Sequence, residues 1–212
     1  MYIEEKKKVI QAGITLHNYR LISLSGGNVS LRIGKHVLVT PSGMTYEELV
    51  PEDIVVVDTE GTVIEGTRRP SVDTEALLYI LRELPEMTAV IHTHQPYATA
   101  VGLIADELPA AVMPLLNATK GPVTVAPYSS SASITMGIKA VENLKGSLAV
   151  ILKHHGVVTV GATLKEALYA AVYLEDSAKT YCIARSASLD IPVLTGPQLK
   201  QAVEGFNDYG QK

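Results

Sequence analysis

Hydrophobic positions recur at helical spacing in two long stretches of the chain. In residues 71–84, apolar side chains fall at positions i, i+1, i+4, i+5 and i+8, and Pro85 ends the pattern. Residues 163–184 repeat apolar side chains three and four positions apart, after a Thr163-x-x-Glu166 sequence that is typical of a capping box. Both stretches are therefore predicted to form amphipathic helices.

Shorter patterns fill most of the remaining chain. Helices are predicted over residues 4–17, 96–104 and 134–143, with a short one near the C-terminus. Apolar runs bounded by turn residues predict strands over residues 29–33, 36–40, 54–58, 88–94, 123–126, 148–152 and 157–160. The last two strands flank Lys153-His154-His155-Gly156, which predicts a tight hairpin. This irregular alternation favours a helix-covered mixed or antiparallel sheet over a doubly wound one.

Composition narrows the class of protein further. A length of 212 residues with 47% hydrophobic residues predicts one domain spanning residues 1–212 with a large core. The single cysteine, Cys182, cannot form an intrachain disulfide, which favours a reducing, cytoplasmic location. A net charge of -4, with no basic block beyond residues 6–8, argues against nucleic acid as a partner. No apolar run approaches the roughly 20 residues of a membrane span, so no membrane partner is expected.

Four of the six histidines lie in two tight groups, His92-Thr93-His94 and His154-His155. On a strand, residues i and i+2 point to the same face about 6.5–7 Å apart, so two imidazoles can converge on one ion. A pair of hydrogen-bonded strand histidines would explain an isolated His-x-His equally well. The second group, followed by a glycine that allows close backbone approach, favours a metal site. Three histidines with an open coordination position suit Zn²⁺ or a similar cation that acts as a Lewis acid.

A catalytic metal commonly works beside a carboxylate, and Asp73 and Glu75 open the predicted helix 71–84. An acidic residue in the first turn of a helix is also an ordinary N-terminal cap. Spacing alone leaves both roles open for Asp73.

Three short segments, residues 25–28, 40–43 and 70–71, are rich in exposed N–H and hydroxyl donors. Such turns form nests that bind phosphate, and Ser71 lies at a predicted helix N-terminus, where the helix dipole favours an anion. Each segment alone is also an everyday turn. The chain has neither a Walker A sequence nor a Gly-x-Gly-x-x-Gly pattern after a strand, so no nucleotide cofactor is indicated.

Taken in order, six motifs resemble the class II aldolase/adducin family, and its fuculose-phosphate aldolase branch most closely. They are SGGNVS (25–30), VTPSGM (39–44), PSVDTEALLY (70–79), AVIHTHQPYATAV (89–101), VAPY (125–128) and KHHGVVTVGATLKEAL (153–168). The similarity extends from about residue 12 to residue 209. It implies a three-layer α/β/α fold with a central, mostly antiparallel sheet covered by helices on both faces. It also implies a homotetramer with active sites at subunit interfaces, and a tail from about residue 186 that packs near the active site.

The resemblance assigns roles to individual residues. It implies Zn²⁺ (or Mn²⁺ or Co²⁺) held by His92, His94 and His155, with His154 a neighbour only. It places Asp73 at the family's acidic position and Tyr209 at a functional tyrosine, although a tail aromatic can also simply pack on a neighbour. The positions implied to bind the substrate phosphate are Gly27, Asn28, Ser42, Gly43 and Ser71.

The implied reaction is cleavage of a ketose 1-phosphate, a small-molecule sugar phosphate, to dihydroxyacetone phosphate and an aldehyde. Breaking a C–C bond beta to a carbonyl leaves negative charge as an enediolate, which a divalent cation spreads while a carboxylate moves the proton. Phosphate held by backbone N–H groups orients the carbon chain. No Schiff-base lysine is required.

Three positions depart from the aldolase pattern. Asp73 replaces a glutamate that is one methylene longer, Val72 replaces a phosphate-binding serine, and Met113 replaces a catalytic tyrosine. The changes at Val72 and Met113 indicate that the aldehyde portion or the phosphate position of the substrate differs from that of fuculose phosphate.

The L-ribulose-5-phosphate 4-epimerase branch is the first alternative. Its reaction also uses an acid in the loop after the His-x-His region, and residues 110–121 contain no Asp or Glu, which favours an aldolase. A dehydratase or decarboxylase of the family is a further alternative. A non-catalytic, adducin-like binding module is disfavoured because such members lack the three metal histidines.

Overall fold

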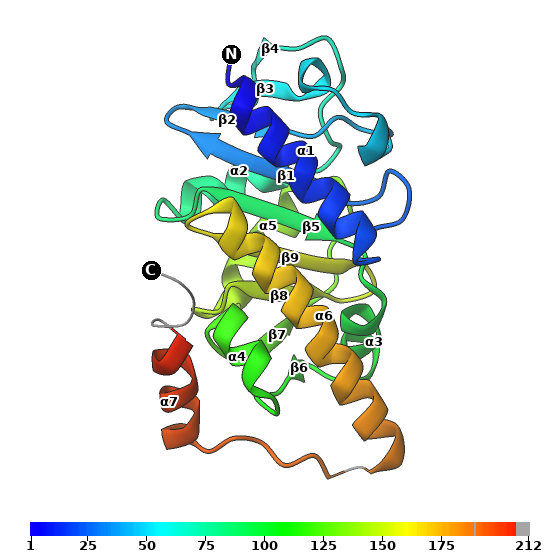
Figure 1. The fold of residues 1–212 in the computed structure, drawn as a ribbon, viewed down its shortest axis with the longest axis vertical. Coiled ribbons are helices and arrows are strands. Elements are labelled where there is room, and N and C mark those ends of the chain that lie inside the picture. The colour runs from blue at the N-terminus through cyan, green and yellow to red at the C-terminus, as the bar shows by residue number, and fades with distance from the viewer. Residues whose placement is uncertain (189, 207–212) are drawn as a thin grey trace.

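A computed structural model describes residues 1–188 and 190–206 of the chain. Within these residues the strands form one nine-stranded sheet in the order β4-β3-β2-β1-β5-β9-β8-β7-β6 (Figure 1). The strands are β1 Asn28–Ile33, β2 His36–Val39, β3 Val55–Asp58, β4 Val63–Glu65, β5 Ala89–Thr93, β6 Glu107–Leu108, β7 Val123–Ala126, β8 Ala149–Leu152 and β9 Gly156–Gly161. The pair β7–β8 is parallel and the other described pairs are antiparallel.

Helices cover both faces of this sheet (Figure 1). They are α1 Ile3–Asn18, α2 Thr74–Glu83, α3 Pro96–Ile104, α4 Met113–Thr119, α5 Ile134–Leu144, α6 Leu164–Ala187 and α7 Gly196–Phe206, with short 3-10 turns at Tyr46–Glu48 and Pro51–Asp53. Strand β2 shows how the faces divide, since Val37 and Val39 join the core under α2 and α5, whereas Leu38 joins the core under α1 and α6. The expected α/β fold with a mostly antiparallel sheet between helical layers is confirmed.

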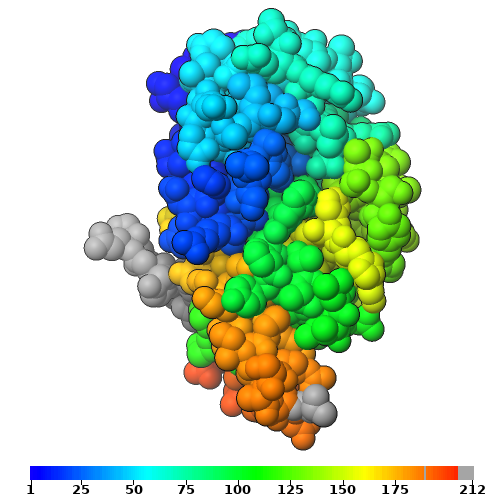
Figure 2. Space-filling model, turned by 90° about the vertical axis from the view of Figure 1, so that its right-hand side faces the viewer, coloured from blue at the N-terminus to red at the C-terminus, as the bar shows by residue number. Residues whose placement is uncertain are grey.

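Strand β5 is central to the sheet and positions the candidate site. It pairs with β1 on one side, where Asn28 lies opposite His92, and with β9 on the other, where Val158 lies opposite His92. Strands β8 and β9 form the predicted hairpin, with Leu152 opposite Gly156. Figure 2 views the right-hand side of Figure 1 and shows blue, green and yellow segments, which are distant in sequence, meeting on one face.

The predicted elements are found with ends shifted by no more than three residues. The capping box is largely as expected: the N–H of Glu166 donates to Thr163 Oγ1 at 3.1 Å, while the Glu166 carboxylate accepts from the N–H of Ala162 at 2.7 Å. Strands β4 and β6 were not predicted because one is a short, largely exposed edge and the other has two residues. Residues 113–119, expected in a loop, form α4; with Pro114 in a seven-residue helix, they are too few to show a helical period.

The C-terminal segment packs on α4. Ala202 of α7 is buried against Ala110 and Leu116, and the N–H of Leu194 donates to the carbonyl of Ala110 at 2.9 Å. Tyr209 lies outside the described residues, so its predicted role stays a prediction. Among the helices that the structure describes, none combines the length and the apolar run needed to cross a bilayer.

Helices α2 and α5 approach each other closely at a glycine. A Cβ built on Gly137 of α5 would lie 2.7 Å from the carbonyl oxygen and 3.0 Å from the Cα of Ala76 in α2. Because the obstacle is backbone, neither side can move aside by changing a rotamer. The absence of a side chain at Gly137 therefore sets the distance between the two helices.

The substitution Gly137→Ala is expected to destabilise the protein. Alanine is normally better than glycine inside a helix by about 1 kcal/mol, but the clash with Ala76 reverses the sign, and we expect a net loss of about 1–3 kcal/mol. The free energy of unfolding in urea measures the effect. Gly121→Ala is the matched control, because a Cβ there would meet nothing within 4 Å. A Gly137→Ala protein that is more stable than the wild type would contradict this packing.

Candidate functional site

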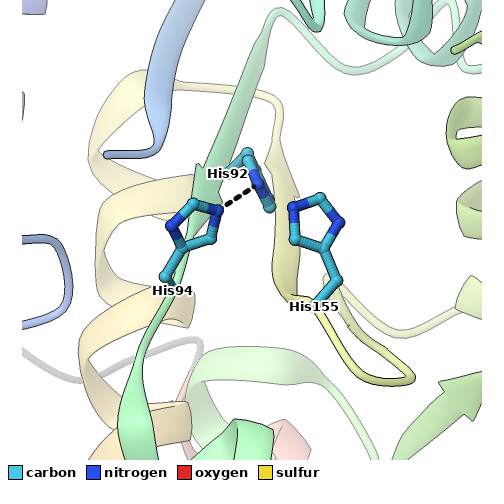
Figure 3. Close-up of side chains that lie close together, drawn as sticks. All are labelled: His92, His94 and His155. Atoms are coloured by element: carbon cyan, nitrogen blue, oxygen red, sulfur yellow. Dashed lines mark hydrogen bonds between the residues drawn. The ribbon is translucent and has the colours of Figure 1, made fainter. Parts of the chain in front are cut away.

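Three histidines from two distant segments meet at one end of β5 (Figure 3). His92 lies within the β5 ladder, and His94 lies just beyond Thr93, the last residue of that strand. His155 lies in the tight turn between β8 and β9, where its N–H donates to the carbonyl of Leu152 at 3.1 Å. The turn is closed by His154, whose φ of 61° is in the left-handed region. The sheet register thus brings together residues more than sixty positions apart.

The three imidazoles converge as metal ligands do. One ring nitrogen from each of His92, His94 and His155 lies within 4.8 Å of the others. The Nε2 atoms of His92 and His94 are 3.0 Å apart, and the ring centroid of His155 is 4.7 Å from that of His92. His92 Nδ1 donates to the carbonyl of Val157 at 2.8 Å, and since a carbonyl can only accept, Nδ1 carries the proton. Its Nε2 lone pair therefore faces the other two rings.

The environment keeps these rings neutral. Burial lowers the pKa of His92 from 6.5 to about 4; the nearby Asp73 charge opposes this shift, and positive charge on His155 or His94 would add to it. Burial also lowers the pKa of His94 and of His155. Neutral imidazole is the form that binds a divalent cation, so the cluster is in its binding form at neutral pH.

Asp73 is buried beside this cluster, and within the described chain its side chain does not cap α2. Its Oδ2 accepts from Asn28 Nδ2 at 2.8 Å, and its Oδ1 accepts from the N–H of Ala132 at 3.1 Å. The contacts thus favour a role in the site over the capping role that the sequence left open. Glu75 is exposed on α2 and takes no part in these contacts.

The three Gly/Ser turns are brought together in two steps. The N–H of Ser42 donates to the carbonyl of Arg69 at 2.9 Å, and the N–H of Ser71 donates to the carbonyl of Thr40 at 3.0 Å, so residues 40–43 and 69–71 run side by side. Ser71 is also close to Asp73, since its Oγ accepts the N–H of Asp73 at 3.3 Å.

The remaining turn, residues 25–28, enters β1 next to His92. A Cβ on Gly27 would lie 2.5 Å from the carbonyl oxygen of His92, and the φ of Gly27 is +70°. Asn28 Oδ1 is buried and has no hydrogen-bond partner among the described residues. Gly43 also has a positive φ, 75°, and is exposed like Ser42. Residues 25–28 therefore bring a free amide oxygen next to His92, and residues 42–43 present exposed backbone.

Two contributors carried no sequence signal. The carbonyl of Val157 orients His92, and the N–H of Ala132 holds Asp73; both are backbone groups that every non-proline residue possesses. Of the positions that depart from the family pattern, Val72 and Met113 are both exposed. His154 is exposed as well, with its ring 6.4 Å from that of Tyr128, and is not part of the convergent set.

Comparison with known proteins finds similar chains over most of the sequence. The 5-methylthioribulose-1-phosphate/5-deoxyribulose-1-phosphate aldolase of Rhodospirillum rubrum is 33% identical over 187 residues, which cover 88% of this chain and 83% of that protein. The L-fuculose phosphate aldolase of Haemophilus influenzae is 30% identical, with 98% of this chain and 95% of that protein covered. A solved structure of an L-fuculose 1-phosphate aldolase superposes with a TM-score of 0.90 at 29% identity, covering 95% of each chain.

The family model described as Class II Aldolase and Adducin N-terminal domain matches residues 7–182, which include all three histidines and Asp73. Since that match spans most of the chain, and the fold agrees over nearly its whole length with a solved aldolase, the protein belongs to the class II aldolase and adducin family.

Proposed function

We propose that this protein is a zinc-dependent aldolase that cleaves a ketose 1-phosphate to dihydroxyacetone phosphate and an aldehyde. The observation that carries the proposal is the convergence of three neutral imidazoles beside a buried carboxylate. The aldolase names of the similar proteins support the reaction class. A non-catalytic module would have no use for such a cluster.

The donor set fits a divalent cation with an open coordination position. His92, His94 and His155 would hold it through one nitrogen each, and Zn²⁺ suits such imidazole ligands, with Mn²⁺ or Co²⁺ as substitutes. When bound, the cation supplies Lewis-acid stabilisation of the enediolate charge that C–C cleavage creates.

Asp73 is proposed to move the proton between carbon and oxygen of the substrate. Its two oxygens are held by the Asn28 amide and the N–H of Ala132, so the carboxylate is fixed in direction. These donors are neutral, which leaves the negative charge of Asp73 without a cationic partner in these two bonds. The second proton-transfer group is proposed to be Tyr209, on the resemblance alone.

The phosphate of the substrate is proposed to bind where the three Gly/Ser turns meet. Asn28 Nδ2 donates to Asp73, and the buried amide oxygen of Asn28 has no partner among the described residues, so this oxygen is free to accept a hydrogen bond from a hydroxyl of the bound substrate. The proposed contacts are Gly27, Asn28, Ser42, Gly43 and Ser71.

The substrate is proposed to be a ketose 1-phosphate whose distal part is not that of fuculose. Both named relatives act on ketose phosphates, one on L-fuculose phosphate and the other on 5-methylthioribulose or 5-deoxyribulose 1-phosphate. The changes at Val72 and Met113 argue against a substrate like fuculose phosphate, and we therefore propose a substrate of the second kind. By the same resemblance, the working form is proposed to be a cytoplasmic homotetramer with active sites at subunit interfaces.

The proposed activity is tested with a panel of ketose phosphates. We expect more dihydroxyacetone phosphate from 5-deoxyribulose 1-phosphate than from L-fuculose 1-phosphate, no product after chelation, and recovery on adding Zn²⁺. His94→Ala removes one of three imidazoles and is expected to abolish stoichiometric metal and turnover, while His154→Ala, outside the cluster, should retain both. Isomerised pentulose phosphate from L-ribulose 5-phosphate without triose release would favour the epimerase instead. A wild-type protein that binds no divalent metal would favour the binding module.

The substitution Asp73→Asn is expected to separate metal binding from proton transfer. The free Oδ1 of Asn28 lets its amide flip and accept from the new amide, so the site should stay folded. We expect metal content close to that of the wild type, and exchange of the C3 proton of dihydroxyacetone phosphate with solvent slowed by about a hundredfold or more, the range of a general base. Exchange in D₂O followed by NMR measures this. An unchanged exchange rate would show that Asp73 has a structural role and does not transfer the proton.

The metal-free protein is expected to lose stability as the pH falls from about 6.5 towards 4. The folded state holds the pKa of His92, His94 and His155 below the unfolded value, so the unfolded chain takes up protons first in this window and is favoured there. Above about pH 7 this contribution to stability is fully present. Thermal melting of the chelated protein across the window measures it, and His155→Gln should flatten the dependence. A pH-independent melting temperature would contradict the lowered pKa values.

A further inference from the structure

His94 is the one member of the triad whose place is not set by the sheet ladder or by the β8–β9 turn. His92 is paired on both sides within β5, and His155 is held in the tight hairpin turn. His94 comes after the last ladder residue, and its own N–H donates to the carbonyl of Leu21 at 3.2 Å. The direction of its side chain therefore depends on how the segment beyond it is held.

A buried polar network lies immediately after His94. Gln95 is fully buried; its Oε1 accepts from Thr93 Oγ1 at 2.7 Å, and its Nε2 donates to the carbonyl of Ala171 in α6 at 3.3 Å. Gln95 is also the N-cap residue of α3, but its side chain makes no capping bond there. Its amide instead links the end of β5 to α6 through these two hydrogen bonds.

The N-terminus of α3 is capped from another helix. Pro96 has no N–H, and the N–H groups of Tyr97 and Ala98 both donate to the Glu175 carboxylate of α6, at 2.9 and 3.0 Å. Glu175 is itself buried. Burial raises the pKa of the Glu175 carboxyl, and the two N–H bonds act against that shift. Burying this acid carries a cost, which its two hydrogen bonds to the start of α3 offset.

We propose that Glu175 and Gln95 are positioning residues for the metal site, which clamp the segment after His94 to α6 and thereby hold the His94 imidazole in its ligand direction. The inference rests on the proposed function, since it concerns the cation that the triad would hold. The clamp works from both sides of His94, through Thr93 and Gln95 at the end of β5 and through residues 97 and 98 at the start of α3. A shift of this segment would move His94 relative to His92, which the ladder keeps in place.

Glu166 provides a matched control on the same helix. It too is a glutamate of α6 whose carboxylate accepts a backbone N–H, that of Ala162, but it caps the start of α6 itself and pairs with Lys120. Glu175→Gln and Glu166→Gln therefore make the same chemical change, loss of a negative charge that accepts backbone N–H bonds. They differ in whether the N–H groups belong to the segment that carries His94.

The test is a Co²⁺ titration of the metal-free proteins, read by the visible absorption of bound Co²⁺, together with the melting temperature of each variant. We expect Glu175→Gln to weaken Co²⁺ binding by about tenfold and to alter the absorption spectrum, as loss of outer-shell support does. Glu166→Gln should lower stability to a similar degree but bind Co²⁺ within about twofold of wild type. Thr93→Val, which removes the hydroxyl bonded to Gln95, should weaken binding in the same direction and serves if Glu175→Gln does not fold.

The outcomes separate this inference from the proposed function. Equal Co²⁺ affinity and spectra in wild type, Glu175→Gln and Thr93→Val would overturn the clamp and leave the metal site standing. Weaker binding in both glutamate variants, in proportion to their loss of stability, would also overturn it by showing a general structural effect. If the wild-type protein binds no Co²⁺, both the proposed function and the clamp are contradicted.

Discussion

The hydrogen bond from His92 Nδ1 to the carbonyl of Val157 is the constraint on which the candidate site depends. It joins a side chain of β5 to the backbone of β9, and those strands are already paired at neighbouring residues, so ring and sheet hold each other in register. The bond turns Nδ1 of His92 towards Val157 and leaves Nε2, with its free lone pair, facing the other two rings. A slip of β5 by one residue would turn His92 to the opposite face of the sheet and dismantle the triad.

Close packing of backbone around the end of β5 makes this arrangement possible. A Cβ on Gly156 would lie 2.2 Å from the carbonyl oxygen of Thr93, and one on Gly27 would lie 2.5 Å from that of His92. The two glycines approach β5 from β9 and β1, the neighbouring strands on either side. Larger side chains would push these strands apart where His92 must meet the other two rings. Both glycines lie in motifs that resemble the aldolase family. Each allows the strands to pack closely, and the same close packing brings the site residues together.

The parts of the fold and of the site that depend on side-chain type could be predicted from the sequence, whereas those that depend on tertiary backbone contacts could not. Side-chain patterns placed most strands and helices to within a few residues, and the two histidine groups already indicated a metal site. The role of Asp73 could not be decided, because a helix-capping acid and an acid in a site look alike until its partners Asn28 and Ala132 are seen. Val157 and Ala132 contribute backbone hydrogen bonds that depend on tertiary structure, so their residue types do not predict them. The role of Glu175 could not be predicted either, since a glutamate within a long helix is ordinarily exposed.

The electrostatics of the cluster favour one divalent cation over protons. Burial penalises every positive charge placed there, and Asp73 offsets part of that penalty for all three rings. Protons must be added one ring at a time, and a charge on His94 or His155 makes the next protonation of His92 harder. A divalent cation binds three nitrogen lone pairs at once, without the repulsion between successive protonated rings. The attraction between Asp73 and the bound charge therefore forms in a single binding event. Neutral donors to Asp73 matter for the same reason, because a lysine or arginine in the place of Asn28 would offset the negative charge that attracts the cation.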